Sequence, residues 1–340
     1  MVYTNPMKLI FRLLKYGLFI LIGFIVLAII TGDKEPNTSE EVSTGATSTK
    51  TPGGEQGSEV PQVNTLGWND SPYITRDGKE LYFMYSRYNF YPIFSGGKPF
   101  LQGPDRPGHH TNDVNPFDDS DIYVAERNAD GSWGTPQNLS FNDNRGGCCA
   151  MVVEGPPFTI YYQTHYEGMG TDIVYRVRNA DGTWGKEINM GTNVNSPQTE
   201  DNPHASADQQ GIWFTSNRPG GLGGNDIWFS QKVNGVWQPA VNVGAPISTG
   251  ANEDQFWVSA MDNTVYFNRE ATIYETKWTG NGFTEPVALD LGRPFVAEAS
   301  MPDSGNELFF GSPDTEKQKM KIFYARKNSN GSWGEPIPVD

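Results

Sequence analysis

Cysteine, histidine and basic residues are all scarce in this sequence of 340 residues. The two cysteines are adjacent, and the four histidines are too few and too scattered to predict a metal site. Lysine and arginine number 25 against 40 acidic residues, which gives a net charge of −15. Because clustered basic side chains bind a nucleic-acid backbone, no nucleic acid partner is expected. No glycine-rich loop opens a helical pattern, so neither a nucleotide nor another cofactor is predicted.

Long hydrophobic runs are also absent, except near the start of the chain. Lys8, Arg12 and Lys15 precede residues 16–31, an uncharged segment dominated by Leu, Ile, Phe and Val. Basic residues on this side predict a short cytoplasmic tail and an extracytoplasmic remainder, periplasmic or at the cell surface. The apolar core is intermediate between that of a signal peptide and a span of ~20 residues. Residues 1–32 are therefore predicted to be an uncleaved signal anchor in the membrane; cleavage and secretion are the alternative.

Residues 33–60 have no aromatic side chain and are rich in Ser, Thr, Gly, Glu and Pro. A segment of this composition cannot bury enough apolar surface to fold. We expect a flexible tether with a reach of roughly 30 Å, since the mean span of a flexible chain grows as the square root of its length.

The remainder of the chain is built from repeats. An aromatic-rich strand pattern occurs at residues 81–83, 160–162, 212–214, 265–267 and 308–310. A second aromatic position, which we assign to the fourth strand, recurs at spacings of 51, 53, 46 and 50 residues, at Trp133, Trp184, Trp237, Phe283 and Trp333. A period near ~50 residues with four short strands per copy is typical of a β-propeller. The sequence therefore predicts an all-β protein, a five-bladed β-propeller over residues 61–340 behind an N-terminal transmembrane or signal helix.

The predicted blades cover about residues 65–140, 145–191, 198–244, 252–292 and 296–340. In blade one, 33 residues (88–120) separate the second strand from the third, where blade three has seven (219–225). Loops of this length are usually functional or disordered, and the aromatic content of this insert favours a packed loop. Two interpretations stay open: a cap that plugs one mouth of the propeller, and a lid over a ligand or partner.

Blade three carries four motifs that resemble a known repeat: PHASAD at 203–208, FTSNRPGG at 214–221, DIW at 226–228 and WQP at 237–239. They are similar to the WD40-like propeller repeat called PD40, known from TolB and from many envelope proteins. The resemblance covers about residues 65–340, although Cys149 stands where an acid is usual and Lys321 replaces the aspartate of the third strand. It implies a propeller in the cell envelope that binds or scaffolds more often than it catalyses. The peptidoglycan-binding module often joined to such propellers is absent, so wall anchoring is not implied.

Acidic and basic residues recur at fixed places in the repeats. Eleven residues before the aromatic-rich strands stand Asp70, Cys149, Asp201, Asp254 and Ala297, the last followed by Glu298. In a propeller, the innermost strands begin on the face where the second strands end, and basic residues follow those second strands. We therefore predict that one mouth carries an acid–arginine ring of eight residues, Asp70, Arg87, His165, Asp201, Arg218, Asp254, Arg269 and Glu298.

The acid–arginine ring has two interpretations. It is a candidate ligand site, because ligands favour concave places with a few convergent polar groups. Equally, repeated aspartates at strand starts commonly accept backbone N–H bonds in turns and are then structural. A carbohydrate-active enzyme resembling a glycosidase is the catalytic alternative, since such enzymes use two carboxylates. Its candidates are Asp70, Asp201, Asp254 and Glu298, among which no distinct acid and base pair stands out.

Cys148 and Cys149 are expected near the same mouth. In an oxidising compartment they could form a vicinal disulfide, although a bridge between neighbours is strained. The alternative is two small buried apolar side chains. The sequence as a whole favours a propeller that binds or scaffolds an envelope protein or glycan, and it favours this reading over an enzyme.

Overall fold

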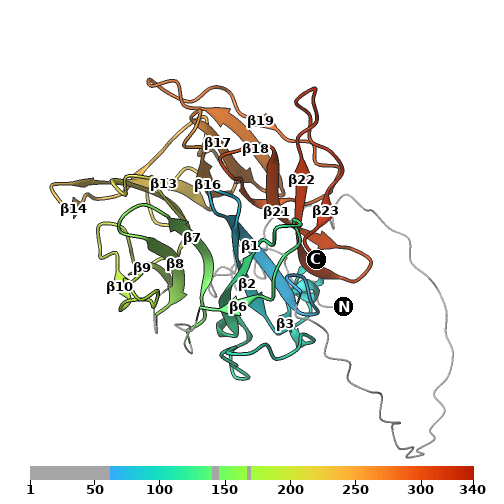
Figure 1. Cartoon of the computed structure of the whole chain (residues 1–340). Helices are drawn as coiled ribbons and strands as arrows, with labels where there is room; N and C mark the ends of the chain where they lie inside the picture. The colour runs from blue at the N-terminus through green and yellow to red at the C-terminus, as the bar shows by residue number, and fades with distance from the viewer. Residues whose placement is uncertain (1–61, 140–144, 167–169) are drawn as a thin grey trace, which may run out of the picture.

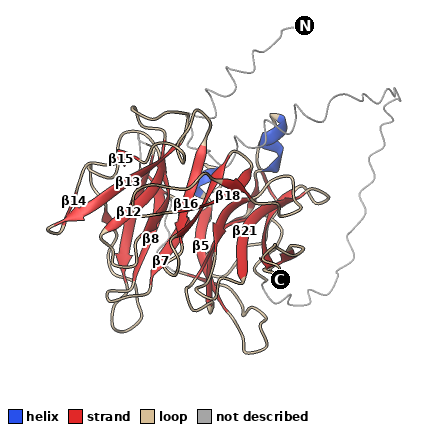
Figure 2. Ribbon diagram, turned by 90° about the horizontal axis from the view of Figure 1, so that it is seen from above, coloured by secondary structure: helices blue, strands red, loops and turns tan. Residues whose placement is uncertain are grey.

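The computed structural model describes residues 62–139, 145–166 and 170–340. Their strands form five antiparallel sheets, one for each predicted repeat, and a small two-stranded sheet within the insert. In chain order the five sheets follow one another around a common centre (Figure 1). Turned by 90°, the strands stand side by side with loops at both of their ends (Figure 2). The chain is therefore an all-β, five-bladed β-propeller.

In each blade the chain runs outward from the axis. The innermost strands are β1 (Trp68–Ile74), β7 (Cys148–Val153), β11 (Glu200–Ala205), β16 (Glu253–Val258) and β20 (Ala297–Ser300). The second strands are β2 (Glu80–Ser86), β8 (Thr159–His165), β12 (Gly211–Ser216), β17 (Thr264–Arg269) and β21 (Glu307–Asp314). The third strands are β5 (Ser120–Glu126), β9 (Thr171–Val177), β13 (Asp226–Val233), β18 (Thr272–Lys277) and β22 (Lys319–Arg326). The outermost strands are β6 (Gln137–Asn138), β10 (Ile188–Asn189), β15 (Val241–Asn242), β19 (Val287–Ala288) and β23 (Ile337–Pro338), and blade three adds β14 (Val236–Trp237).

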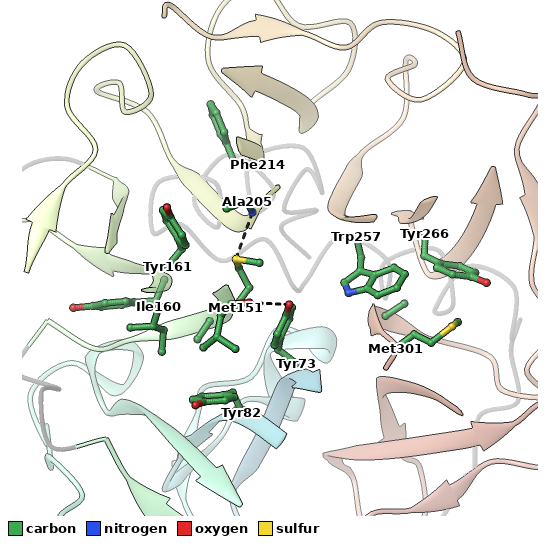
Figure 3. Close-up of a cluster of buried hydrophobic side chains, with 14 of the residues drawn as sticks. Tyr73, Tyr82, Met151, Ile160, Tyr161, Ala205, Phe214, Trp257, Tyr266 and Met301 are labelled. Carbon is green, nitrogen blue, oxygen red and sulfur yellow. Dashed lines mark hydrogen bonds between the residues drawn. The ribbon is translucent and has the colours of Figure 1, made fainter. Parts of the chain in front are cut away.

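Apolar side chains of the inner strands join the blades near the axis. Figure 3 shows Tyr73, Met151, Ala205, Trp257 and Met301, which come from five different blades and belong to one buried cluster. The hydroxyl of Tyr73 donates to a backbone carbonyl of blade two at 3.0 Å, and the N–H of Ala205 donates to the sulfur of Met151 at 3.4 Å. Burying one large apolar side chain contributes about 1.5–3 kcal/mol, so no blade could be stable without its neighbours.

The ring closes without a strand exchanged between the two ends of the chain. All four strands of blade five come from the C-terminal part of the sequence. Asn64, near the start of the described chain, accepts the N–H of Ile322 and donates to its carbonyl, both at 2.8 Å. Asn195 makes the same pair of bonds with Ile173 between blades two and three, at 2.9 Å. The start of the propeller thus acts as one more connection between blades.

The recurring aromatic residue lies before the outermost strand, which corrects its predicted place in the fourth strand of four blades. Trp133, Trp184, Phe283 and Trp333 each make a single isolated bridge to the end of the third strand. The outermost strand then starts four residues later in every blade. A proline stands between the aromatic residue and that strand in four of the five blades. Because proline cannot donate to a ladder, the pairing is interrupted there.

The insert packs as a cap over one end of the axis. It contains β3 (Tyr88–Asn89), η2 (Tyr91–Ser95), β4 (Phe100–Leu101) and η3 (Pro116–Asp118). Its Phe90 lies edge-on to Trp68, with ring centres 5.6 Å apart, and stacks on Phe117 at 5.1 Å. These rings form a buried cluster with Cys148 and Cys149 at the start of β7. In Figure 2 one 3-10 segment, drawn in blue, lies beyond the strand ends on one side of the propeller.

The predicted signal anchor, residues 1–32, and the tether, residues 33–60, lie outside the described residues. Within the part of the chain that the structure describes, no helix has the length and apolar character needed to cross a bilayer.

Candidate functional site

Each innermost strand contains a β-bulge at the same place. The residue at the bulge has a left-handed backbone conformation, with φ between 45° and 59°. We call these residues the bulge ring: Ser71, Cys149, Asn202, Gln255 and Glu298. A positive φ costs roughly 1–2 kcal/mol for residues other than glycine, and asparagine tolerates it best. Five such residues at equivalent positions mean that contacts around the axis hold the conformation in place.

The bulges correct the predicted alignment of blade two. Asp70, Asp201 and Asp254 directly precede a bulge residue. In blade two that position belongs to Cys148, and Cys149 is itself the bulge residue. Counting eleven residues back fails there because the connection to the second strand is one residue longer than in the other blades. In blade five the aligned residue is an alanine, and Glu298 occupies the bulge.

Three backbone N–H groups of the bulge ring bond to the second strand of the blade before them. The acceptor is a polar side chain of the preceding second strand, so each bond joins two neighbouring blades. The pairs are Asn202 with Gln163 (3.2 Å), Gln255 with Thr215 (3.0 Å) and Glu298 with Asn268 (2.9 Å).

Between blades five and one, a carboxylate replaces that second-strand side chain. The N–H of Ser71 donates to Glu298 Oε2 at 2.7 Å, and its hydroxyl donates to Oε1 at 3.0 Å. The equivalent second-strand residue is Gly311, where an added Cβ would lie 2.4 Å from Asp70 Oδ1. Asp70 Oδ2 in turn accepts a bond from Trp68 Nε1 at 3.1 Å. Gly311 therefore leaves the space that the Asp70 carboxyl group needs.

Four carboxyl groups meet around the axis, and we call them the carboxyl cluster: Asp70, Asp201, Asp254 and Glu298. Three are buried and Asp254 is half-buried. Burial raises the pKa of all four, and repulsion from neighbouring carboxylates raises the pKa of Asp201 and Glu298 further. The hydrogen bonds that Asp254 Oδ1 accepts come from uncharged groups: Asn202 and Thr215, both at 2.7 Å. A cluster held in this way favours a shared set of protons over four negative charges.

The basic members of the acid–arginine ring lie apart from these carboxyl groups. Arg218 pairs with Glu200 at 2.8 Å, and Arg269 pairs with Glu253 at 2.9 Å. Glu200 directly precedes Asp201, and successive residues of a strand point to opposite faces. The eight predicted residues therefore do not form one ring: the acids gather at the axis, and the cations pair with other acids beside it.

Arg87 and His165 hold the insert. Two nitrogens of the Arg87 guanidinium, Nη2 and Nε, donate hydrogen bonds to Asp119 Oδ2, at 2.6 and 2.9 Å. His165 Nδ1 lies 2.6 Å from Asp118 Oδ1. Asp119 is completely buried, which by itself would raise its pKa, but hydrogen bonds from His109 and Arg87 lower the pKa to about 2. These two basic residues therefore fasten the cap over the carboxyl cluster.

The two cysteines lie beneath the cap as free thiols. Their sulfur atoms are 3.4 Å (Cys148) and 3.3 Å (Cys149) from the hydroxyl oxygen of Ser71. Burial raises the pKa of the Cys149 thiol well above its ordinary value, so the thiolate is disfavoured. A vicinal disulfide between these residues stays a prediction.

The space at the axis is small. The bulge ring and the residues that follow it line a cavity of about 30 Å³. A water molecule needs roughly 10–15 Å³ measured in this way, so the cavity has room for water and none for a sugar ring. Among the described residues, no group of three or more His, Cys, Asp or Glu side chains is placed to hold a metal ion.

A much larger groove opens beside the insert, between blades one and five. Its volume is about 610 Å³, and we call it the insert groove. One wall begins at Gln62, the first described residue, and a second is formed by residues 102–107 of the insert. The third wall carries Lys317, Lys319 and Lys321 from the β21–β22 hairpin. Sequence reasoning missed this groove, although alternating lysines in a strand are a signal for one basic face.

Comparisons with solved structures find similar chains at low sequence identity. The chain is similar to TolB from Acinetobacter baumannii, with 12% identity over 78% of this chain and 67% of that one, and a TM-score of 0.45. It is also similar to CoXyl43, a GH43 β-xylosidase/α-arabinofuranosidase from a compost microbial metagenome, with 11% identity over 82% and 98% of the two chains and a TM-score of 0.49. A xylan β-1,4-xylosidase from Bacillus halodurans C-125 shares 13% identity over 80% and 56%, with a TM-score of 0.46.

No protein-family model matches the chain, and no curated protein matches its sequence. Likenesses at this level of identity and similarity carry no argument about activity. The number of blades rests on the strand pairing of the chain itself.

Proposed function

We propose that this protein is a membrane-tethered, extracytoplasmic propeller that binds a glycan or a protein of the cell envelope. In this proposal residues 16–31 hold the chain in the membrane and residues 33–60 are the tether. The binding face is the mouth that carries the insert. The resemblance to PD40 repeats supports the location, and the net charge of −15 is consistent with a partner other than a nucleic acid.

The observation that carries this proposal is the contrast between the two hollows at that mouth. At the axis, the bulge ring and the residues that follow it line a cavity of about 30 Å³, and Glu298 is the member of the carboxyl cluster that lines it. Beside the insert, a groove of about 610 Å³ reaches the surface. Binding pockets for small ligands commonly have volumes of about 300–1,000 Å³. The open groove therefore suits binding, whereas a hydrolase would need its carboxyl pair open to substrate.

The glycosidase hypothesis is the second candidate, and one observation favours it. Asp70, Asp201, Asp254 and Glu298 do gather around the axis, and their pKa values are raised, as the acid of such a pair requires. Their burial and their bonds to neighbouring blades favour the structural role instead.

A double substitution separates the two hypotheses. We expect Asp201→Asn with Asp254→Asn to lower the melting temperature and to leave binding to envelope polysaccharides on a glycan array unchanged below that temperature. A hydrolase would instead release reducing sugar from one of these polysaccharides and lose that activity in the double variant with its fold intact. Failure of the full chain to bind any envelope glycan or protein would contradict the proposed function itself.

A further inference from the structure

The insert groove concentrates positive charge in a strongly acidic protein. Lys317 is exposed on the hairpin, and Lys319 and Lys321 begin β22. Because residues two apart in a strand point to the same side, Lys319 and Lys321 share one face of β22, the face on the groove. Arg106 lines the opposite wall. The acidic side chains of Asp105 and Asp340 line the groove as well, so its four basic side chains outnumber two acidic ones in a chain with fifteen more acidic than basic residues.

Lys319 carries a positive charge in a buried position, which is energetically unfavourable. Only 4% of it is exposed, and its ammonium group donates to the carbonyl of Thr65 at 2.7 Å. Burial, together with the positive charges of Lys321 and Lys317, lowers the pKa of Lys319 to about 8. Lys321 has a carboxylate partner, Asp314, at 3.2 Å. A buried ammonium among like charges is the arrangement that an anionic ligand would relieve.

Arg106 places a positive charge on the opposite wall of the groove. Among the described residues, no carboxylate forms a salt bridge with it. It is 5% exposed, and its guanidinium lies 4.1 Å from the ring centre of Tyr85. Its Nη2 donates to backbone carbonyls at residues 62 and 63 and to the hydroxyl of Thr65. Its Nε and Nη1 have no hydrogen-bond partner within the described part of the chain. The positive potential of the groove therefore arises from both walls.

We propose that the insert groove binds a saccharide that bears a carboxylate or phosphate group, with Lys317, Lys319 and Lys321 as the anion site. This inference rests on the proposed function and names the class of ligand for the same mouth. A volume of about 610 Å³ far exceeds a single inorganic anion, so the anionic group belongs to a larger molecule. Apart from its charged groups, the groove offers side-chain amides at Gln62 and Gln102, which match sugar hydroxyls.

The test is binding of the full chain in detergent to three saccharides and one peptide. Oligogalacturonate carries carboxylates, glucose phosphate carries a phosphate, and a neutral galacto-oligosaccharide carries neither; poly-glutamate is the acidic peptide. We expect one of the two anionic saccharides to bind and the neutral one not to bind, with affinity falling as salt rises. The anionic saccharide that binds identifies the group.

Substitution of the lysines locates the site. Lys319→Gln removes a charge-assisted bond, and we expect a roughly ten- to hundred-fold loss of affinity. Because Lys319 is buried, Lys317→Gln is the second variant; it lies on the exposed hairpin, and we expect roughly ten-fold weaker binding with an unchanged melting temperature. Lys186→Gln, an exposed lysine of blade two, is the matched control and should bind as the wild type does.

Three results would overturn the inference. If an anionic saccharide binds but Lys317→Gln and Lys319→Gln bind it as tightly as the control, the groove is not its site, although the proposed function would stand. If poly-glutamate binds in a lysine-dependent manner and neither anionic saccharide does, the ligand is an acidic peptide. Equal binding of the neutral and anionic saccharides would likewise remove the anion site.

Discussion

Asp119 is the carboxylate that fastens the insert over the axis, and its removal should destabilise the protein strongly. It is completely buried and bonds to the guanidinium of Arg87 twice, at 2.6 and 2.9 Å. Its other oxygen contacts the backbone N–H of Arg87 at 3.0 Å and Nε2 of His109 at 3.1 Å. Asp119→Asn leaves Arg87 without its buried partner. Because breaking a buried pair from one side typically costs about 3–5 kcal/mol, we expect the free energy of unfolding to fall by about 3 kcal/mol.

The pH dependence gives an independent magnitude. Hydrogen bonds lower the pKa of Asp119 from 3.8 to about 2, although burial alone would raise it. The folded state therefore holds the proton less tightly than the unfolded state. The stabilisation is complete above pH ~4 and is lost as the pH falls through about 2. A difference of nearly two pKa units corresponds to about 2–3 kcal/mol, consistent with the estimate from the broken pair.

Urea unfolding of the full chain, at pH 7 and at steps down to pH 2, measures both quantities. Asp113→Asn is the matched control, because Asp113 contacts the same guanidinium at 2.7 Å while its side chain is 75% exposed. Exposed pairs contribute about 0–1 kcal/mol, so this variant should lose little stability. The reasoning is refuted if Asp119→Asn and Asp113→Asn lose stability equally, or if Asp119→Asn loses as much stability between pH 4 and pH 2 as the wild type.

The remaining predictions concern the axis. Gly311→Ala should lower the free energy of unfolding by about 1–3 kcal/mol, because the added Cβ would crowd Asp70. The control is Gly282→Ala, whose added Cβ meets no atom within 4 Å and which should change the free energy of unfolding by less than about 0.5 kcal/mol. Equal effects on urea midpoints would argue against the crowding. Cys148 and Cys149 should resist alkylation in the native protein and react in urea without reductant, as intact mass would show. If neither cysteine is alkylated in urea without reductant, the vicinal disulfide is present instead.

The fold could be predicted because its signal is repeated and local. Aromatic triplets such as residues 81–83 and 212–214 lie inside β2 and β12, and the turns between strands keep the copies in register. The number of blades followed from the number of copies. The path of the insert could not be predicted in the same way, because it occurs once. Its cap over the axis depends on contacts such as that between Arg87 and Asp119, which are 32 residues apart and belong to no repeat.

The site was predictable only in part, because successive residues of a strand point to opposite faces of the sheet. Spacing alone placed Asp70, Asp201 and Asp254 at equivalent positions, and the structure gathers them at the axis. Spacing does not reveal which face of a strand a residue occupies. Glu200 and Asp201 are neighbours in sequence, yet Arg218 pairs with the first and leaves the second. Counting residues also cannot detect a bulge, which shifts the register at the place where the carboxyl groups meet.

The departures from the repeat are as informative as the repeat itself. A propeller brings equivalent positions together at its axis, so an aspartate in every blade would concentrate five buried like charges there. Cys148 reduces that number to four, since Glu298 supplies a carboxyl group in blade five beside the alanine, and Gly311 makes space for the carboxyl group of Asp70. In the same blade, Lys321 replaces the aspartate of the third strand and, with Lys319, turns that face basic. Blade five therefore keeps one carboxyl group at the axis, that of Glu298, and supplies the lysine-bearing wall of the insert groove on its flank. Restoring the repeat there, with Lys321→Asp, should place a carboxylate beside Asp314, weaken binding of the anionic saccharide, and leave the carboxyl cluster unchanged.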